Sequence, residues 1–537
     1  KIPTKWYLSI QLLAIPALAI FLLIKKTVSP HNDLLQILVQ YSMVTLLTQY
    51  AIFNVSMLRN SARFVLYLLM SFISFLFSTF FMAFFTSREY LFAAAPMRIF
   101  MSSLISMVTH FPGSTSFEES VIIVQLMLFM QMLSQQMVQI DLHYNTQTLN
   151  ILLFENIENI SSQSTKDYLF RFSVYFFLQL TTLSLLFLFV VKSTDFTNSE
   201  YQKPNFFQAF LNRLKFKQLF TLAGFVFLTN FIFAKRKDSN IFDISEFLNQ
   251  ILHLDNYNTV KRQISKYLVV TMVFFGLKFI AFQIFKKQIN TNLYIAFARK
   301  SYHAYYYIIY IQTQEKYIFF TAITCIISLN CILESLRGLY SSIYFKATKQ
   351  SVYDQKTMVS LTQIQMLISV PIAAAVTFCC SMPKICEFSG LISLVGDALA
   401  QIIPSIYIQL FEEGILQWGD LFQIKLMVVP IYCQGYPFPI QYNWEFPPTP
   451  NFKQIKFANN DLQLDLQANQ LKSALRSRTI IGTFSNIVGQ ISFMKILSHK
   501  NGVWGAQTLS CFVAGLLEAV CVADNILIPL VLVLLMG

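Results

Sequence analysis

The sequence predicts an all-α fold, a polytopic bundle of transmembrane helices. Of the 537 residues, 55% are apolar and only 12% are charged, whereas soluble domains carry about 25% charged residues. Apolar runs of about 20 residues, the length that crosses a hydrocarbon core of about 30 Å, recur along the chain. Only helices satisfy their own backbone polar groups in such a segment, because the bilayer core offers no water. We expect about 12 spanning helices, with a margin of about two.

The expected spans follow the apolar runs. They are 7–24, 35–57, 64–86, 121–140, 172–191, 218–234, 267–285, 317–333, 358–380, 388–411, 479–495 and 503–523, with an apolar tail at 526–536. Basic residues gather at the ends of such runs, at Lys25-Lys26, Lys235-Arg236-Lys237, Lys286-Lys287 and Arg299-Lys300. Their side chains can reach anionic headgroups, which accounts for a net charge of +13.

These features predict an integral membrane location. The expected partners are the lipid bilayer and its anionic lipid headgroups. No nucleic acid is expected, because no soluble domain is present to carry a basic face. Basic residues are nearly balanced between alternate sides of the expected spans, so the organelle and the orientation stay unassigned.

Glycine and proline divide the chain into two regions. Of the 15 glycines, only Gly113, Gly224, Gly276 and Gly338 precede residue 357. Both residue types permit kinks and close helix contacts. We therefore predict a Phe/Leu/Tyr-rich, Gly-poor scaffold region at 1–350. A functional region richer in Gly, Pro and Cys follows at 351–537, and it contains an extramembrane loop at 412–477.

Asp397 is the first candidate for a functional site. An ionised group at mid-bilayer costs about 3 kcal/mol or more, so its presence needs a reason. Asp397 lies within an expected span, beside Gly396 and ahead of Pro404. Gly396 thins the helix and Pro404 frees a backbone carbonyl, which predicts a polar notch for a cation or a proton. A packing role, with Asp397 hydrogen-bonded to a neighbouring helix, is the alternative.

Glu518 and Asp524 are two further candidates in the last apolar stretch. A break at Asp524-Asn525 would separate a full span from a half-helix that ends at Met536. Broken helices of this kind line binding sites in transporters. A simple turn at the membrane surface is the alternative. Lys278, inside another apolar run, could neutralise one of the carboxylates or extend towards the headgroups.

A polar stripe is predicted on the helix at 121–140. Gln131, Gln135 and Gln139 recur there at four-residue spacing and therefore share one helix face. Such a face lines an aqueous path in some proteins and joins helices by hydrogen bonds in others, and both interpretations stay open.

Two short stretches resemble known families. Gly390-Leu391-Ile392-Ser393-Leu394-Val395-Gly396, continued to Pro404, resembles a late helix of amino-acid/auxin-permease-type transporters. Tyr353-Asp354, Gly396-Asp397 and Pro529-Leu530 follow the order of three motifs, YD, GxGD and PAL, and so resemble presenilin-type intramembrane aspartyl proteases. Leu394 replaces the first Gly of GxGD, and the last motif lacks its Ala. The second resemblance implies that Asp354 and Asp397 share a proton and activate water.

Common enzyme motifs are absent from the sequence. It contains no HExxH, GxSxG, P-loop or GxGxxG pattern. We therefore expect no catalytic residue, no cofactor and no metal site, and an enzyme is the less favoured class.

The leading hypothesis is a transporter or channel-like subunit with an intramembrane acidic site centred on Asp397. The main alternative is a non-catalytic scaffold or accessory subunit of a larger complex, with other membrane subunits as partners. Only 15 of 537 residues are glycine, against about 7% on average, and mobile transporters use small residues where helices slide. An intramembrane aspartyl hydrolase is the second alternative.

Overall fold

The computed structural model describes residues 14–24, 122–127, 129–130, 133–134, 137, 157–195, 244–252, 254–285, 291–336, 361–412, 480–497, 504–518, 521 and 524–537. Every regular element in these ranges is helical, which confirms the predicted all-α class. The helices are α2 (Ala14–Ile24), α7 (Ile157–Asp195), α10 (Ile244–Leu252), α11 (Leu254–Phe285), α12 (Thr291–Gln312), α13 (Lys316–Leu336), α16 (Thr362–Cys379), the 3-10 helix η3 (Lys384–Phe388), α17 (Ser389–Glu412), α20 (Ile480–Leu497), α21 (Trp504–Glu518) and α22 (Asp524–Met536).

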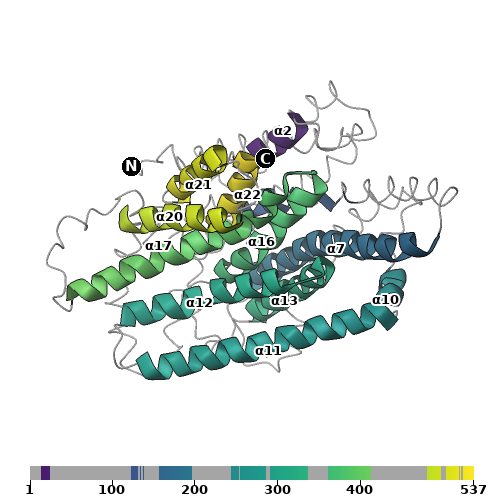
Figure 1. The fold of residues 1–537 in the computed structure, drawn as a ribbon, viewed down its shortest axis with the longest axis horizontal. Coiled ribbons are helices and arrows are strands. Elements are labelled where there is room, and N and C mark those ends of the chain that lie inside the picture. Colours follow the sequence, from purple (N-terminus) through teal and green to yellow (C-terminus); the bar gives the residue numbers. More distant parts are fainter. Residues whose placement is uncertain are drawn as a thin grey trace.

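The long helices lie side by side along the longest dimension of the molecule (Figure 1). α7 and α13 run parallel, because Lys166 bonds Glu315 at 2.9 Å near their starts and Ser184 bonds Ser328 at 2.9 Å further along. α12 runs antiparallel to α17, since Tyr310 near the end of α12 donates a hydrogen bond to Glu387, just before α17 begins. We call the end of the bundle that carries η3 the η3 end.

α22 lies at the centre of the second half of the bundle. It packs against α2, α16, α17, α21 and η3. Residues Ile526–Val533 are all buried, so the sequence ILIPLVLV has no polar face to offer. The helix is apolar all round because it is surrounded all round by other helices.

Within the described residues, four helical segments are long and apolar enough to cross a membrane. They are Lys166–Leu188, Tyr257–Ala281, Lys316–Ser335 and Lys384–Ile406, close to four of the predicted spans. The predicted total of about 12 is not confirmed, and the predicted spans at 35–57, 64–86 and 218–234 and the loop at 412–477 lie outside the described residues.

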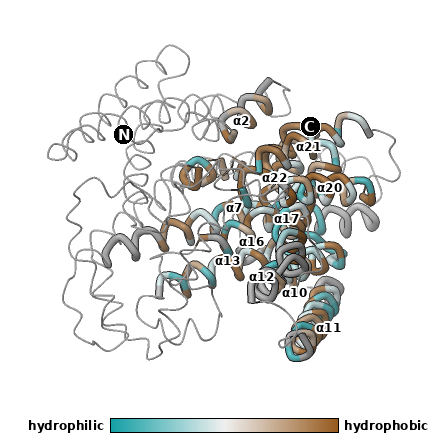
Figure 2. Tube along the Cα trace, turned by 90° about the vertical axis from the view of Figure 1, so that its left-hand side faces the viewer, coloured by the Kyte–Doolittle hydropathy of each residue, from teal (hydrophilic) through white to brown (hydrophobic). Residues whose placement is uncertain are grey.

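α11 carries the clearest lipid-compatible surface. It lies at the edge of the bundle, apart from most other helices (Figure 2). Met272 and Phe279 are 71% and 64% exposed, and Leu277 is 63% exposed. Apolar surface of this extent on one helix is typical of contact with lipid or with another protein.

The prediction of one spanning helix at 503–523 is wrong, because two short helices fold back on each other in this part of the chain. α21 has 15 residues and α22 has 13, so each is about 20 Å long and too short to cross about 30 Å of hydrocarbon. Ser510 of α21 donates a hydrogen bond to the carbonyl of Leu535 in α22 at 3.1 Å. The two helices therefore form an antiparallel hairpin, whose tip lies between Glu518 and Asp524.

α16 and α17 approach each other closely at a glycine. A Cβ atom added to Gly390 would lie 2.5 Å from Val370 Cα and 2.6 Å from the carbonyl oxygen of Ser369. Both contacts are with backbone, which cannot rotate away as a side chain can. Gly390 therefore sets the distance between α16 and α17, the helix that carries Asp397.

We predict that Gly390→Ala lowers the unfolding temperature in detergent, because the added methyl group forces two helix backbones apart. Gly276→Ala is the matched control, since a Cβ there meets nothing within 4 Å. In an exposed helix, alanine is favoured over glycine by about 1 kcal/mol, so this control unfolds at the same temperature or higher. Equal unfolding temperatures for the two variants would contradict the close contact.

Candidate functional site

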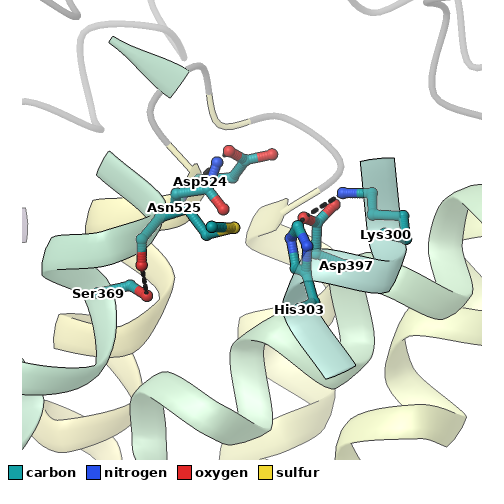
Figure 3. A network of polar contacts seen from close by, with 7 residues as sticks. Lys300, His303, Ser369, Asp397, Asp524 and Asn525 are labelled. Atoms are coloured by element: carbon teal, nitrogen blue, oxygen red, sulfur yellow. Dashed lines mark hydrogen bonds and ion pairs between the residues drawn. The ribbon is translucent and has the colours of Figure 1, made fainter. Parts of the chain in front are cut away.

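The site is built around Asp397, which lies near the middle of the apolar segment Lys384–Ile406. Its side chain is buried, and Lys300 Nζ donates a hydrogen bond to Asp397 Oδ2 at 2.5 Å. His303 Nε2 lies 3.0 Å from the same oxygen. Both partners come from α12, and Figure 3 shows them facing Asp397 together.

Lys300 and His303 reach one carboxylate because of their spacing. Residues three apart share one face of a helix, so both side chains point from α12 towards α17. Lys300 and Asp397 expose only 5% and 9% of their side chains. A buried ion pair of this kind is stable only while both partners are present, because either charge alone is strongly disfavoured in the interior.

Two more carboxylates complete the cluster. One oxygen each of Asp397, Glu518 and Asp524 lies within 4.8 Å of the others. Glu518 is the last residue of α21 and Asp524 the first of α22, so the tip of the hairpin delivers both side chains to Asp397. We call Asp397, Glu518, Asp524, Lys300 and His303 the Asp397 cluster.

The start of α22 favours negative charge in this cluster. The first backbone N–H groups of a helix carry a partial positive charge, about half an elementary charge in total. The backbone N–H of Asn525 donates to Asp524 Oδ1 at 2.8 Å. Figure 3 shows Asp524 and Asn525 across the site from Lys300. Lys300 and the helix terminus therefore oppose the mutual repulsion of the carboxylates from two sides.

Carboxylate oxygens are the ligand type that hard cations prefer. The three acidic residues could each supply one oxygen to a small cation or hold a shared proton. The ammonium of Lys300 already occupies one side of Asp397, which lowers the attraction for a divalent ion. The arrangement suits a single positive charge better than a double one.

The structure brings together three of the predicted candidates and places the others elsewhere. Asp397, Glu518 and Asp524 are adjacent. Lys278 lies on α11, with its ammonium 3.9 Å from the centre of the Tyr302 ring. Gln131, Gln135 and Gln139 lie outside the described residues, as does Asp354, the partner that the protease resemblance requires.

Two members of the cluster were not expected from the sequence. Arg299-Lys300 was assigned to a helix end facing headgroups, but Lys300 is buried within α12. His303 stands three residues later, and the spacing Lys-x-x-His inside a Tyr-rich apolar stretch was the available signal. Pairing with a residue almost 100 positions away is not visible in local periodicity.

Comparisons of the chain with protein-family models, with curated proteins and with solved structures give no match. The protein is therefore described by its fold and by the geometry of its site. The part of the chain that the structure describes is all-helical, with four segments able to cross a membrane and a buried charge cluster at a helical hairpin.

We predict that Lys300→Met lowers the unfolding temperature markedly. The substitution leaves Asp397 buried without its ammonium, which costs about 3–5 kcal/mol in measured cases. The double variant Lys300→Met/Asp397→Leu should recover most of the loss, because both charges are then gone. Lys278→Met is the matched control, since an exposed cation–π contact is worth about 1 kcal/mol.

Tryptophan fluorescence follows thermal unfolding in detergent for the unaltered protein and the three variants. A double variant no more stable than Lys300→Met would contradict the ion pair.

Proposed function

We propose that the chain is an integral membrane protein that moves protons or small monovalent cations, with the Asp397 cluster as the exchange site. The proposal is supported first by the charge balance of the cluster. Three carboxylates face one ammonium and one imidazole. Two like charges about 5 Å apart repel by about 3 kcal/mol at an effective dielectric constant of about 20.

This repulsion is relieved when one carboxyl group takes up a proton or a cation. Buried carboxylates that share a small volume do not all stay ionised. Glu518 is buried, with 2% of its surface exposed, whereas Asp524 is half-buried. Uptake and release of one positive charge at this place is the elementary step of ion-coupled transport.

The hairpin provides a second support for the proposal. Half-length helices that end inside a bundle are used by transporters to present helix termini to ions and substrates. Here α21 and α22 end at the Asp397 cluster, near the middle of the segment Lys384–Ile406. A terminus at that position is costly in an inert scaffold, because its backbone groups must be satisfied away from water.

The proposed membrane location is supported by the length of four helical segments and by the apolar surface of α11. Lys166–Leu188, Tyr257–Ala281, Lys316–Ser335 and Lys384–Ile406 are each long enough to span. No residue of the most apolar stretch of α11 is fully buried within the protein, which supports contact with lipid.

We predict that Glu518→Gln removes proton flux through reconstituted protein. Liposomes loaded with a pH-sensitive dye are given a potassium diffusion potential, and internal acidification is recorded. The amide keeps the size of the side chain and leaves the Lys300–Asp397 pair in place, but it cannot exchange a proton. Asp397→Asn should abolish flux as well. Glu315→Gln is the matched control, because Glu315 pairs with Lys166 at the η3 end, away from the cluster.

Two results would contradict the proposal. One is flux through Glu518→Gln and Asp397→Asn equal to that of the unaltered protein. The other is a rate for the unaltered protein equal to that of empty liposomes under proton, sodium and potassium gradients. The second result would favour the scaffold alternative, which gains some support from the scarcity of glycine.

A further inference from the structure

α20 carries three buried polar residues on one face. Thr483, Asn486 and Gln490 are spaced by three and four residues, so they line up along the helix. Asn486 and Gln490 have no exposed surface, and Thr483 is 8% exposed. We call these residues the α20 polar stripe. They lie within the predicted span at 479–495, which contains none of the predicted site residues.

Each residue of the stripe has an unsatisfied polar atom. Gln490 Nε2 donates a hydrogen bond to Asn486 Oδ1 at 2.5 Å. Within the described part of the chain, Thr483 Oγ1, Asn486 Nδ2 and Gln490 Oε1 have no hydrogen-bond partner. Leaving such a group buried and unsatisfied is energetically unfavourable. Three in succession indicate a ligand that both donates and accepts hydrogen bonds, and water is the simplest ligand of that kind.

The stripe ends beside Asp397. A Cβ atom added to Gly396 would lie 2.7 Å from Gln490 Cγ and would also meet Asn486 Oδ1. Both amides therefore pack directly on the α17 backbone at the residue before Asp397. The absence of a side chain at Gly396 is what allows this contact.

The stripe leads from the cluster towards one end of the bundle. The Phe493 ring lies 5.1 Å from the Tyr307 ring of α12, and Tyr307 is one turn closer to the η3 end than His303. Phe493 is thus on the η3 side of the cluster. Gln490, Asn486 and Thr483 then run in the opposite direction, and Thr483 lies in the first turn of α20. Figure 1 shows that α20 lies beside α17.

The η3 side of the cluster is mostly apolar. α22 runs from Asp524 towards Met382, which packs against Gly537, and residues Ile526–Val533 are buried along the way. Leu391, Ile392 and Leu394 of α17 are buried on the same side of Asp397, together with the hydroxyls of Ser389 and Ser393. No amide lies among these side chains, whereas the α20 polar stripe has two.

We propose that the α20 polar stripe lines a hydrated path by which protons reach the Asp397 cluster from the end of the bundle opposite η3. The path conducts protons along water molecules held by the hydroxyl and amide groups. On the η3 side, apolar side chains of α22 and α17 leave single hydroxyls at Ser389 and Ser393, so we place the access at the opposite end. The inference rests on the proposed function, because it supplies the route to that exchange site.

Cysteine accessibility tests the path directly. Thr483→Cys, Asn486→Cys and Gln490→Cys are made singly in full-length protein carrying Cys325→Ser and Cys433→Ser. Cys325 is exposed, Cys433 lies outside the described residues, and the other native cysteines are buried. The probe is a cationic, membrane-impermeant methanethiosulfonate, which reacts with thiolates in water and not with thiols in lipid. Phe484→Cys and Val488→Cys are the matched controls on the outer face of α20, where both residues are exposed.

We expect the three stripe cysteines to react about tenfold or more faster than the two controls, because thiols ionise in water and not in hydrocarbon. Reactivity should fall from Thr483→Cys to Gln490→Cys. Lys166→Cys marks the face at the η3 end, where Lys166 is exposed. Spheroplasts and inside-out vesicles from the expression host expose opposite faces. The stripe should react only from the face that leaves Lys166→Cys unmodified.

Equal, slow labelling of the stripe and the outer-face controls would overturn the path. So would labelling of the stripe from the face marked by Lys166→Cys. Circular dichroism and elution volume confirm that each variant folds before labelling. The labelling does not depend on flux, so the two proposals fail separately. If the stripe cysteines react but Asp397→Asn has normal flux, the proposed exchange site is contradicted. If the stripe cysteines do not react but Asp397→Asn has lost flux, only the proposed path is contradicted.

Discussion

The cost of burying charge is the constraint on which the rest of the structure depends. Asp397 lies in an apolar helix, and its carboxylate is stable there because Lys300 and His303 of another helix contact the same oxygen. This requirement fixes the rotation of α12 about its axis and the register of α12 against α17. The pair also explains why α12 packs the face with Lys300, His303, Tyr306 and Tyr310 against the bundle, while Tyr302 and Ile311 on its other face are exposed.

The hairpin of α21 and α22 adds a second constraint. Its tip brings Glu518 and Asp524 to a place that already holds one carboxylate. The start of α22 and the ammonium of Lys300 reduce the repulsion but do not cancel three negative charges. In our proposal this excess lets the cluster take up a proton or a cation, whereas a purely structural ion pair would be neutral. The helices around α22 are packed tightly through glycines such as Gly390 and Gly396, which hold the cluster in place.

The sequence predicted the parts of this arrangement that depend on local pattern. Long apolar runs identified the four segments able to cross a membrane, and an isolated acidic residue in such a run identified Asp397. Glu518 and Asp524 were found in the same way. A break at Asp524 was one of two interpretations of the sequence, beside a turn at the membrane surface. A full span was expected before it, because the composition of α21 does not reveal where the chain reverses.

Features that depend on contacts between distant residues could not be predicted. Arg299 and Lys300 interrupt the hydropathy of α12, so no span was assigned there, yet Lys300 supplies the counter-charge for Asp397. Lys278 was an equally reasonable partner by composition, but α11 places it on Tyr302. Thr483, Asn486 and Gln490 were unremarked, since their significance comes from burial against Gly396 and not from their spacing alone.

The most direct test of the account is infrared difference spectroscopy of the protein in lipid as the pH is changed. The central claim is that the three clustered carboxyl groups cannot all be ionised, so one of them exchanges a proton. The account predicts a carbonyl stretching band of a protonated, buried carboxyl group that changes with pH and disappears in Glu518→Gln or Asp524→Asn. A spectrum without such a band, or one that both substitutions leave unchanged, would contradict it.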